Sequence, residues 1–281
     1  MQIGERRSIY VGECIYCGSK ENLTDEHAIP LALQGNRVLK DGSCLSCNAI
    51  TTRFERFVAR DSMKGIRAVL GMPSRRKQNR PTSLPLIIVR GEERHEIQVP
   101  LEDSVPTLIL PELGPPEIYP EIGHALGLRA GAFEAKLHFP VDRIADKHVR
   151  ALIEKYRADA VETPYELHHQ SFLRLVAKIG ICEAIGVYGL KQFERLFVRD
   201  AVLGKDRPEY WVGSDGRYCL HLQGGFDDSS HVIAAVRSPG QQEVWIRVKL
   251  WNKSITPEYI VVCGRLRKNY ARFLDGHGLI A

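Results

Sequence analysis

Two pairs of cysteines near the start of the chain have the spacing of a metal site. Two residues separate Cys14 from Cys17, and two separate Cys44 from Cys47. Each C-x-x-C turn directs two sulfur atoms toward one point, and four thiolates form the tetrahedral site that Zn²⁺ favours. The stretch between the pairs, residues 18–43, is long enough for a β-hairpin. The spacing therefore predicts a structural Zn²⁺ ion that holds the two ends of a hairpin together.

Three further polar residues accompany the cysteines. Glu26 directly precedes His27 between the two pairs, and Asn48 directly follows the last cysteine. Taken one at a time, these features are ordinary. A Glu-His pair is common in solvated loops, an Asn after Cys is a common helix cap, and a four-cysteine zinc site occurs in many binding modules. Only their joint occurrence at these positions indicates a chemical role.

The combination resembles the HNH, or ββα-metal, endonucleases, and within them the branch of phage junction-resolving enzymes whose zinc knuckles flank the active site. That family has an acidic residue followed by His near the first strand, and an Asn or His where the helix begins. Glu26, His27 and Asn48 match those positions. The family usually has Asp before the His, so Asp25, which would share a strand face with His27, is an alternative ligand. The resemblance covers about the first quarter of the chain.

The resemblance implies a mechanism. A neutral His27 would act as general base toward the water that attacks a phosphodiester, and Glu26 and Asn48 would hold one divalent cation, Mg²⁺ or Mn²⁺. The implied substrate is DNA, duplex by default and branched as a variant. Two alternatives stay open: a zinc-stabilised nucleic-acid-binding or regulatory protein without cleavage activity, and a gated nuclease such as a phage-defence effector.

Positive charge is concentrated at the N-terminal end. Residues 1–80 contain 14 Lys and Arg against 8 Asp and Glu, whereas the remainder has 25 against 26. A helix is predicted from Asn48 to about Val69, and five cations recur along it at steps of three and four residues. This face is either an ordinary solvated surface or a contact for phosphate groups. Its members are Arg53, Arg56, Arg60, Lys64 and Arg67.

The whole chain is predicted to belong to the α+β class. We expect a ββα-metal module over residues 1–73, a basic linker over 74–83, and a larger α+β domain over 84–281 that grips DNA, dimerises or senses a ligand or protein. A homodimer would let one site per chain cut both strands. The expected elements of the larger domain are a hairpin at 84–90 and 95–99, helices at 141–158, 165–186 and 190–203, and strands at 218–222, 232–236, 244–250 and 259–262.

Composition predicts a soluble, cytoplasmic protein. No apolar run reaches transmembrane length, and the first ten residues carry charges in place of an apolar signal segment. Four of the seven cysteines lie in the two C-x-x-C pairs, which fits metal binding in a reducing compartment better than a disulfide framework. The other three, Cys182, Cys219 and Cys263, lie within apolar stretches and are expected to be packing residues.

Overall fold

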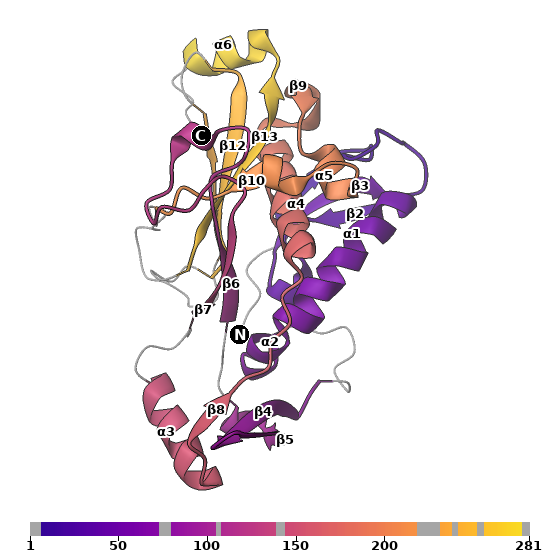
Figure 1. Ribbon diagram of the computed structural model, residues 1–281. Coiled ribbons are helices and arrows are strands. Elements are labelled where there is room, and N and C mark those ends of the chain that lie inside the picture. Colours follow the sequence, from indigo (N-terminus) through magenta and orange to yellow (C-terminus); the bar gives the residue numbers. More distant parts are fainter. Residues whose placement is uncertain are drawn as a thin grey trace.

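A computed structural model describes residues 7–72, 80–104, 108–138, 144–217, 231–237, 241–251 and 256–276. Helices and antiparallel sheets both occur within these ranges, so the predicted α+β class is confirmed. The N-terminal residues and the C-terminal sheet lie on opposite sides of one long central helix (Figure 1).

The N-terminal module, residues 7–72, is built on a hairpin followed by a helix. Strand β2 (Leu23–His27) pairs antiparallel with β3 (Arg37–Cys44), and β1 (Arg7–Tyr10) runs parallel to β3 on its other side. Helix α1 (Leu45–Phe57) begins directly after β3, with Cys44 as its N-cap residue. It packs against β2 and β3, so the predicted hairpin-then-helix arrangement is present.

The helical segment after the hairpin is interrupted. One helix was expected over residues 48–69, but α1 ends at Phe57, a π-helical turn covers Val58–Ser62, and α2 covers Lys64–Val69. The Met63 N–H donates to the Val58 carbonyl at 2.9 Å, the i to i+5 bond of a π-turn. Met63 and Ile66 are buried, so the extra residue in this turn keeps the apolar side of α2 on the core.

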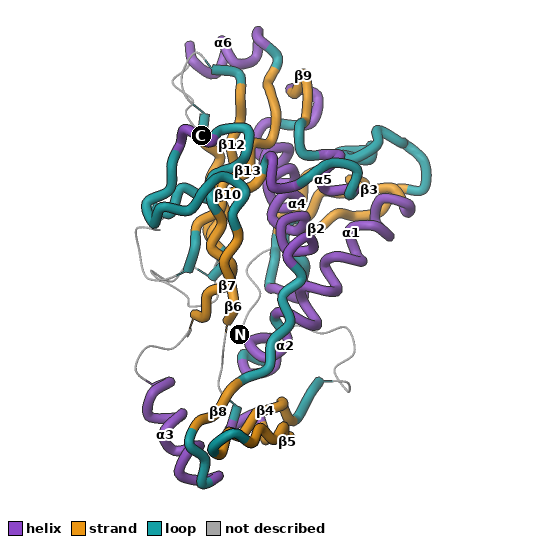
Figure 2. Tube along the Cα trace, viewed as in Figure 1, coloured by secondary structure: helices purple, strands orange, loops and turns teal. Residues whose placement is uncertain are grey.

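Helix α4 (His169–Tyr188) is the central element of the fold. Most of its residues are apolar and nearly all of them are buried, which is the pattern of a core helix. It packs against α1 and against strands β12 (Glu243–Lys249) and β13 (Glu258–Leu266), as Figure 2 shows. Although α4 is apolar, no helix of the described part of the chain is long and apolar enough to cross a membrane.

The C-terminal sheet is antiparallel, as predicted. Its order is β10-β13-β12-β11, with β10 at Val212–Gly213 and β11 at Val232–Val236. The helix expected over 190–203 is replaced by β9 (Phe193–Leu196), which pairs with β13, and by the short helix α5 (Arg199–Leu203). Helix α6 (Lys268–Gly276) follows β13. The strand expected at 218–222 lies outside the described residues.

A second, smaller core lies apart from the main one. Strands β5 (Glu93–Pro100), β4 (Ser83–Arg90) and β8 (Ala160–Glu162) form a sheet that is covered by α3 (Ile144–Tyr156). Strands β6 (Leu108–Leu113) and β7 (Phe133–His138) form a separate two-stranded antiparallel sheet. The main core, in contrast, contains residues of the N-terminal module, of α4 and of the C-terminal sheet, and so it crosses the boundary expected at 74–83.

Candidate metal centre and the buried charges beside it

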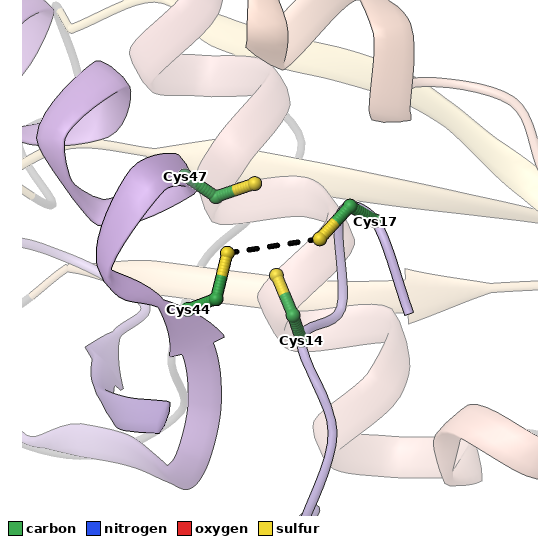
Figure 3. Close-up of side chains that lie close together, drawn as sticks. All are labelled: Cys14, Cys17, Cys44 and Cys47. Carbon is green, nitrogen blue, oxygen red and sulfur yellow. Dashed lines mark hydrogen bonds between the residues drawn. The ribbon is translucent and has the colours of Figure 1, made fainter. Parts of the chain in front are cut away.

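The four cysteines of the N-terminal module converge on one point. Cys14 and Cys17 lie in the loop between β1 and β2, Cys44 ends β3, and Cys47 lies in the first turn of α1. Their sulfur atoms all lie within 4.8 Å of one another, and the sulfurs of Cys17 and Cys44 are 3.7 Å apart (Figure 3). This donor set can hold a metal ion such as Zn²⁺.

The thiols of this cluster affect one another strongly. Burial raises the pKa of the Cys44 thiol, but the backbone N–H of Cys47 and the neighbouring thiols lower it by more, so that it stands at about 7. Burial, followed by the hydrogen bond with Cys44, raises the pKa of the Cys47 thiol well above its usual range. A metal ion binds the thiolate form of cysteine, so metal binding at this cluster would release protons to solvent.

Glu26 is buried and is paired with a lysine from the other half of the chain. Its side chain is only 3% exposed, and its Oε1 atom lies 2.8 Å from Nζ of Lys178, which is fully buried in α4. The other carboxylate oxygen, Oε2, is buried and has no hydrogen-bond partner among the described residues. One oxygen of Glu26 is therefore bound to an ammonium group and the other is left unsatisfied.

Two more oxygen atoms complete the surroundings of Lys178. Its ammonium group donates to Oε1 of Glu55, in the second half of α1, and to the backbone carbonyl of His27 at the end of β2. An ammonium group has three donors, and all three are used here. We call this set, Lys178 with Glu26, Glu55 and the His27 carbonyl, the Lys178 cluster. With both glutamates ionised, its formal charge is −1.

Asp25 and His27 lie near one another at the end of β2. The strand has an irregularity between Thr24 and Glu26, and Asp25 is directed to the surface, where it accepts a hydrogen bond from Lys40. That hydrogen bond is the main cause of the lowered pKa of Asp25, and His27 lowers it further when the imidazole is protonated. The His27 side chain is half-buried.

Asn48 lies within α1 and does not cap it. The helix begins three residues earlier, and the Asn48 Oδ1 atom accepts a hydrogen bond from the Thr52 hydroxyl at 3.4 Å. Asn48 and Glu55 are seven residues apart, so they share one face of α1. The structure thus brings Glu26, Glu55 and the His27 backbone carbonyl together around the Lys178 ammonium group. Asn48 lies two helical turns before Glu55.

The basic face predicted on this helix is divided in two. The first four cations are exposed, whereas Arg67 is half-buried. Arg67 donates from Nε to the Ala32 carbonyl at 2.9 Å and from Nη1 to the Ala59 carbonyl, in the π-turn, at 2.7 Å. Its role in this structure is to join the turn after β2 to the π-turn. The exposed members are Arg53, Arg56, Arg60 and Lys64.

Polar contacts from the rest of the chain hold the N-terminal module against α4 and the C-terminal sheet. Arg37 of β3 forms an ion pair with Glu183 of α4 at 3.0 Å. The Arg199 Nε atom donates to the carbonyl of Ile15, between the first two cysteines, at 2.7 Å. His231 bonds through Nε2 to the Leu33 carbonyl at 2.6 Å and accepts at Nδ1 from the Trp251 N–H at 3.2 Å.

Lys178 and Glu55 were not among the residues predicted from the sequence. The signal for Lys178 was its position in a helix whose neighbouring residues are almost all apolar, because a buried lysine requires a carboxylate partner. Glu55 had a weaker signal, as an acidic residue among the cations of α1. No local pattern links residues that are 123 positions apart in the chain.

Comparison of the chain with protein-family models, with curated proteins and with solved structures found no match.

Proposed function

We propose that the protein is a metal-dependent endonuclease that hydrolyses DNA. The observation that carries the proposal is the hairpin-then-helix module closed by four cysteines, in which Glu26 and His27 end β2 and Asn48 lies in the first turns of α1. These are the positions at which HNH-type nucleases carry their functional residues. A structural Zn²⁺ ion at the cysteines would hold the two ends of the module in register.

His27 is assigned the proton transfer. In its neutral form the imidazole takes a proton from water as the water oxygen attacks phosphorus, and the bond from phosphorus to the 3′ oxygen breaks. An imidazole suits this step because its pKa lies near neutral pH. The products are a 5′ phosphate and a 3′ hydroxyl, and the 3′ oxygen takes its proton from solvent.

The residues around Glu26 fit a divalent cation such as Mg²⁺ or Mn²⁺. The buried Oε2 atom of Glu26 has no hydrogen-bond partner among the described residues, so it can serve as a ligand to a cation. Glu26 and Asn48 are the proposed ligands, and Asp25 is the alternative, although it is bonded to Lys40. Such an ion, when bound, stabilises the negative charge that develops on the phosphate and the leaving oxygen.

Supercoiled plasmid is the most sensitive substrate for a test of this function. We expect nicking or linearisation by the native chain with Mg²⁺ or Mn²⁺, none with EDTA, and none by His27→Ala. Because the His27 side chain is half-buried at the end of a strand, the variant must be shown to keep its zinc and its melting temperature. A His27→Ala chain that meets these conditions and cuts as fast as the native chain would exclude His27 as the base.

A second function is favoured by the ion pair at Glu26. Because this carboxylate is already engaged in an ion pair with Lys178, the resting protein fits a zinc-stabilised nucleic-acid-binding protein without cleavage activity. DNA binding through the exposed cations of α1, with no cutting under any metal condition and in any Lys178 variant, would support this alternative. A nuclease that cuts only after a ligand or partner acts on the C-terminal part lies between these two functions.

A further inference from the structure

We propose that Glu26, Glu55 and the His27 carbonyl form a divalent-cation site that the ammonium group of Lys178 occupies in the resting chain. Glu55 is then a cation ligand, and α4 is an autoinhibitory element. The consequence for DNA cleavage rests on the proposed function, whereas the cation site itself does not.

The atoms around Lys178 have the chemistry of metal ligands. Lys178 Nζ is bound by two carboxylate oxygens and one backbone carbonyl oxygen, and these come from two separate elements, β2 and α1. Carboxylate and carbonyl oxygens are the ligands that Mg²⁺ and Mn²⁺ prefer. A lysine ammonium group is a compact cation, so it can take the place of a metal ion among such ligands.

The lysine leaves one oxygen of Glu26 unsatisfied. Lys178 contacts Oε1, whereas Oε2 stays buried without a hydrogen-bond partner among the described residues. A divalent ion can bind both oxygens of one carboxylate and further oxygen ligands at the same time. The Glu26 carboxylate is therefore better matched to a divalent ion than to the ammonium group that it contacts.

The lysine comes from an element outside the N-terminal module. Lys178 is fully buried in α4, which is packed on all sides, so its ammonium group cannot leave by rotating into solvent. It can leave only if α4 and the N-terminal module move apart. Such a movement would also open the Arg37–Glu183 ion pair and the Arg199–Ile15 hydrogen bond, which join the module to α4 and α5. These contacts would hold the N-terminal module against α4 and so keep the chain in the autoinhibited state.

Mn²⁺ binding tests the proposal without any need for activity. Zinc-loaded native chain and Lys178→Ser are titrated with Mn²⁺, and free Mn²⁺ is followed by electron paramagnetic resonance. We expect Lys178→Ser to bind one Mn²⁺ at least ~100-fold more tightly than the native chain, because a positive charge next to the site is removed. Glu26→Gln in the Lys178→Ser background should abolish this binding. Lys191→Ser, which removes an exposed lysine, should behave as the native chain does.

Three results would overturn the proposal. The first is tight Mn²⁺ binding by the native chain that disappears in Glu26→Gln, because Lys178 would then not exclude the metal. The second is the absence of Mn²⁺ binding in a folded Lys178→Ser chain. The third concerns folding. If Lys178→Ser stays unfolded in saturating Mn²⁺ while Glu26→Gln/Glu55→Gln/Lys178→Met, which has none of the three charges, folds, then Mn²⁺ does not replace the ammonium group. A Lys178→Ser chain that folds only with Mn²⁺ would support the proposal.

The same variants separate this inference from the proposed function. A Lys178→Ser chain that binds Mn²⁺ through Glu26 but never cuts DNA would keep the cation site and overturn the nuclease. A native chain that binds Mn²⁺ through Glu26 as tightly as Lys178→Ser does, and cuts DNA as fast, would keep the nuclease and overturn the role of Lys178.

Discussion

The Nζ atom of Lys178 lies 2.8 Å from Oε1 of Glu26, and the two side chains are 0% and 3% exposed. This ion pair joins the central helix of the C-terminal part to the strand that carries the candidate catalytic residues. The two halves of the chain consequently share one main core and one buried network of charges.

The Lys178 cluster should contribute strongly to stability. Lys178→Met removes the ammonium group from the buried Glu26 carboxylate and from the half-buried Glu55 carboxylate, and we expect a loss of about 3–5 kcal/mol in the free energy of unfolding. Adding Glu26→Gln and Glu55→Gln removes both negative charges and should restore most of the loss. Urea unfolding at neutral pH measures both changes. A loss below ~1 kcal/mol in Lys178→Met would show that the carboxylates are not held by this lysine.

Removal of the metal should unfold the N-terminal module. A structural zinc site supplies folding free energy directly, so chelation should lower the melting temperature and expose the main core that the module shares with α4. Cys44→Ser should bind no zinc, whereas Cys263→Ala, which changes a buried cysteine of β13, should keep one zinc per chain. Zinc content measured by atomic emission shows whether the four cysteines hold the metal ion. Equal zinc in both variants would contradict the four-cysteine site.

His231 should make the joint between the module and the C-terminal sheet sensitive to acid. Burial lowers the pKa of His231, and the bond to the Leu33 carbonyl offsets only part of this effect. A histidine whose pKa is lower in the folded state gives its full stability above the unfolded pKa of ~6.5 and loses it as the pH falls toward the folded value. Protonation of Nδ1 also removes the acceptor for the Trp251 N–H.

The measurement for His231 is a comparison of two chains. Between pH 7.5 and pH 5.5 the urea midpoint of the native chain should fall further than that of His231→Gln. Parallel curves for the two chains would show that the pKa of His231 is the same in the folded and unfolded states, which would contradict the lowered pKa.

The exposed cations of α1 should contribute to DNA affinity. Arg53→Ala/Arg56→Ala should weaken binding and lower the slope of log affinity against log salt by up to about 0.9 for each phosphate group that the variant no longer neutralises. Lys147→Ala/Arg150→Ala removes the same charge from exposed positions of α3, which lies well apart from α1 (Figure 1), and should change neither quantity appreciably. DNA affinity is measured by fluorescence anisotropy. Equal effects of the two double variants would mean that DNA affinity depends on the net charge of the protein and not on the position of these cations.

Arg67 should behave differently from its neighbours on the helix. It donates to the carbonyls of Ala32 and Ala59, so Arg67→Ala should lower the free energy of unfolding by about 1–3 kcal/mol. Its direct contribution to DNA affinity should be small once the variant is folded. A stable Arg67→Ala chain with DNA affinity reduced as much as in Arg53→Ala/Arg56→Ala would contradict this assignment.

Features that depend on local spacing could be predicted from the sequence. The two C-x-x-C pairs lie on either side of one hairpin, so their convergence follows from a short stretch of chain, and the alternating pattern of β11, β12 and β13 predicted their sheet. The segment 190–203 was misassigned because Phe193 and Leu196, three residues apart, fit a helical stripe. In the structure both are buried in β9, where a shift of register against β13 allows two exposed residues between them.

Features that depend on distant residues could not be predicted. Glu26 was assigned as a site residue from its place beside His27, but its ion-pair partner comes from a helix about 150 residues later in the chain. The two side chains come into contact only in the folded core, so no local pattern predicts the pair. The same holds for Arg67. Its spacing fits a charged helix face, whereas the π-turn at 58–62 and the turn after β2 supply the carbonyls that bind it.

The N-terminal module is proposed to cut DNA with His27 as base and with a cation at Glu26 that Lys178 displaces. DNA cleavage by Lys178→Ser in Mn²⁺, compared with Lys178→Ser/His27→Ala, tests this most directly. We predict that Lys178→Ser nicks or linearises supercoiled plasmid faster than the native chain and that the double variant, with its zinc and bound Mn²⁺ intact, does not cut. Equal cleavage by both variants, or no cleavage by a Lys178→Ser chain that holds Mn²⁺, would contradict the proposal.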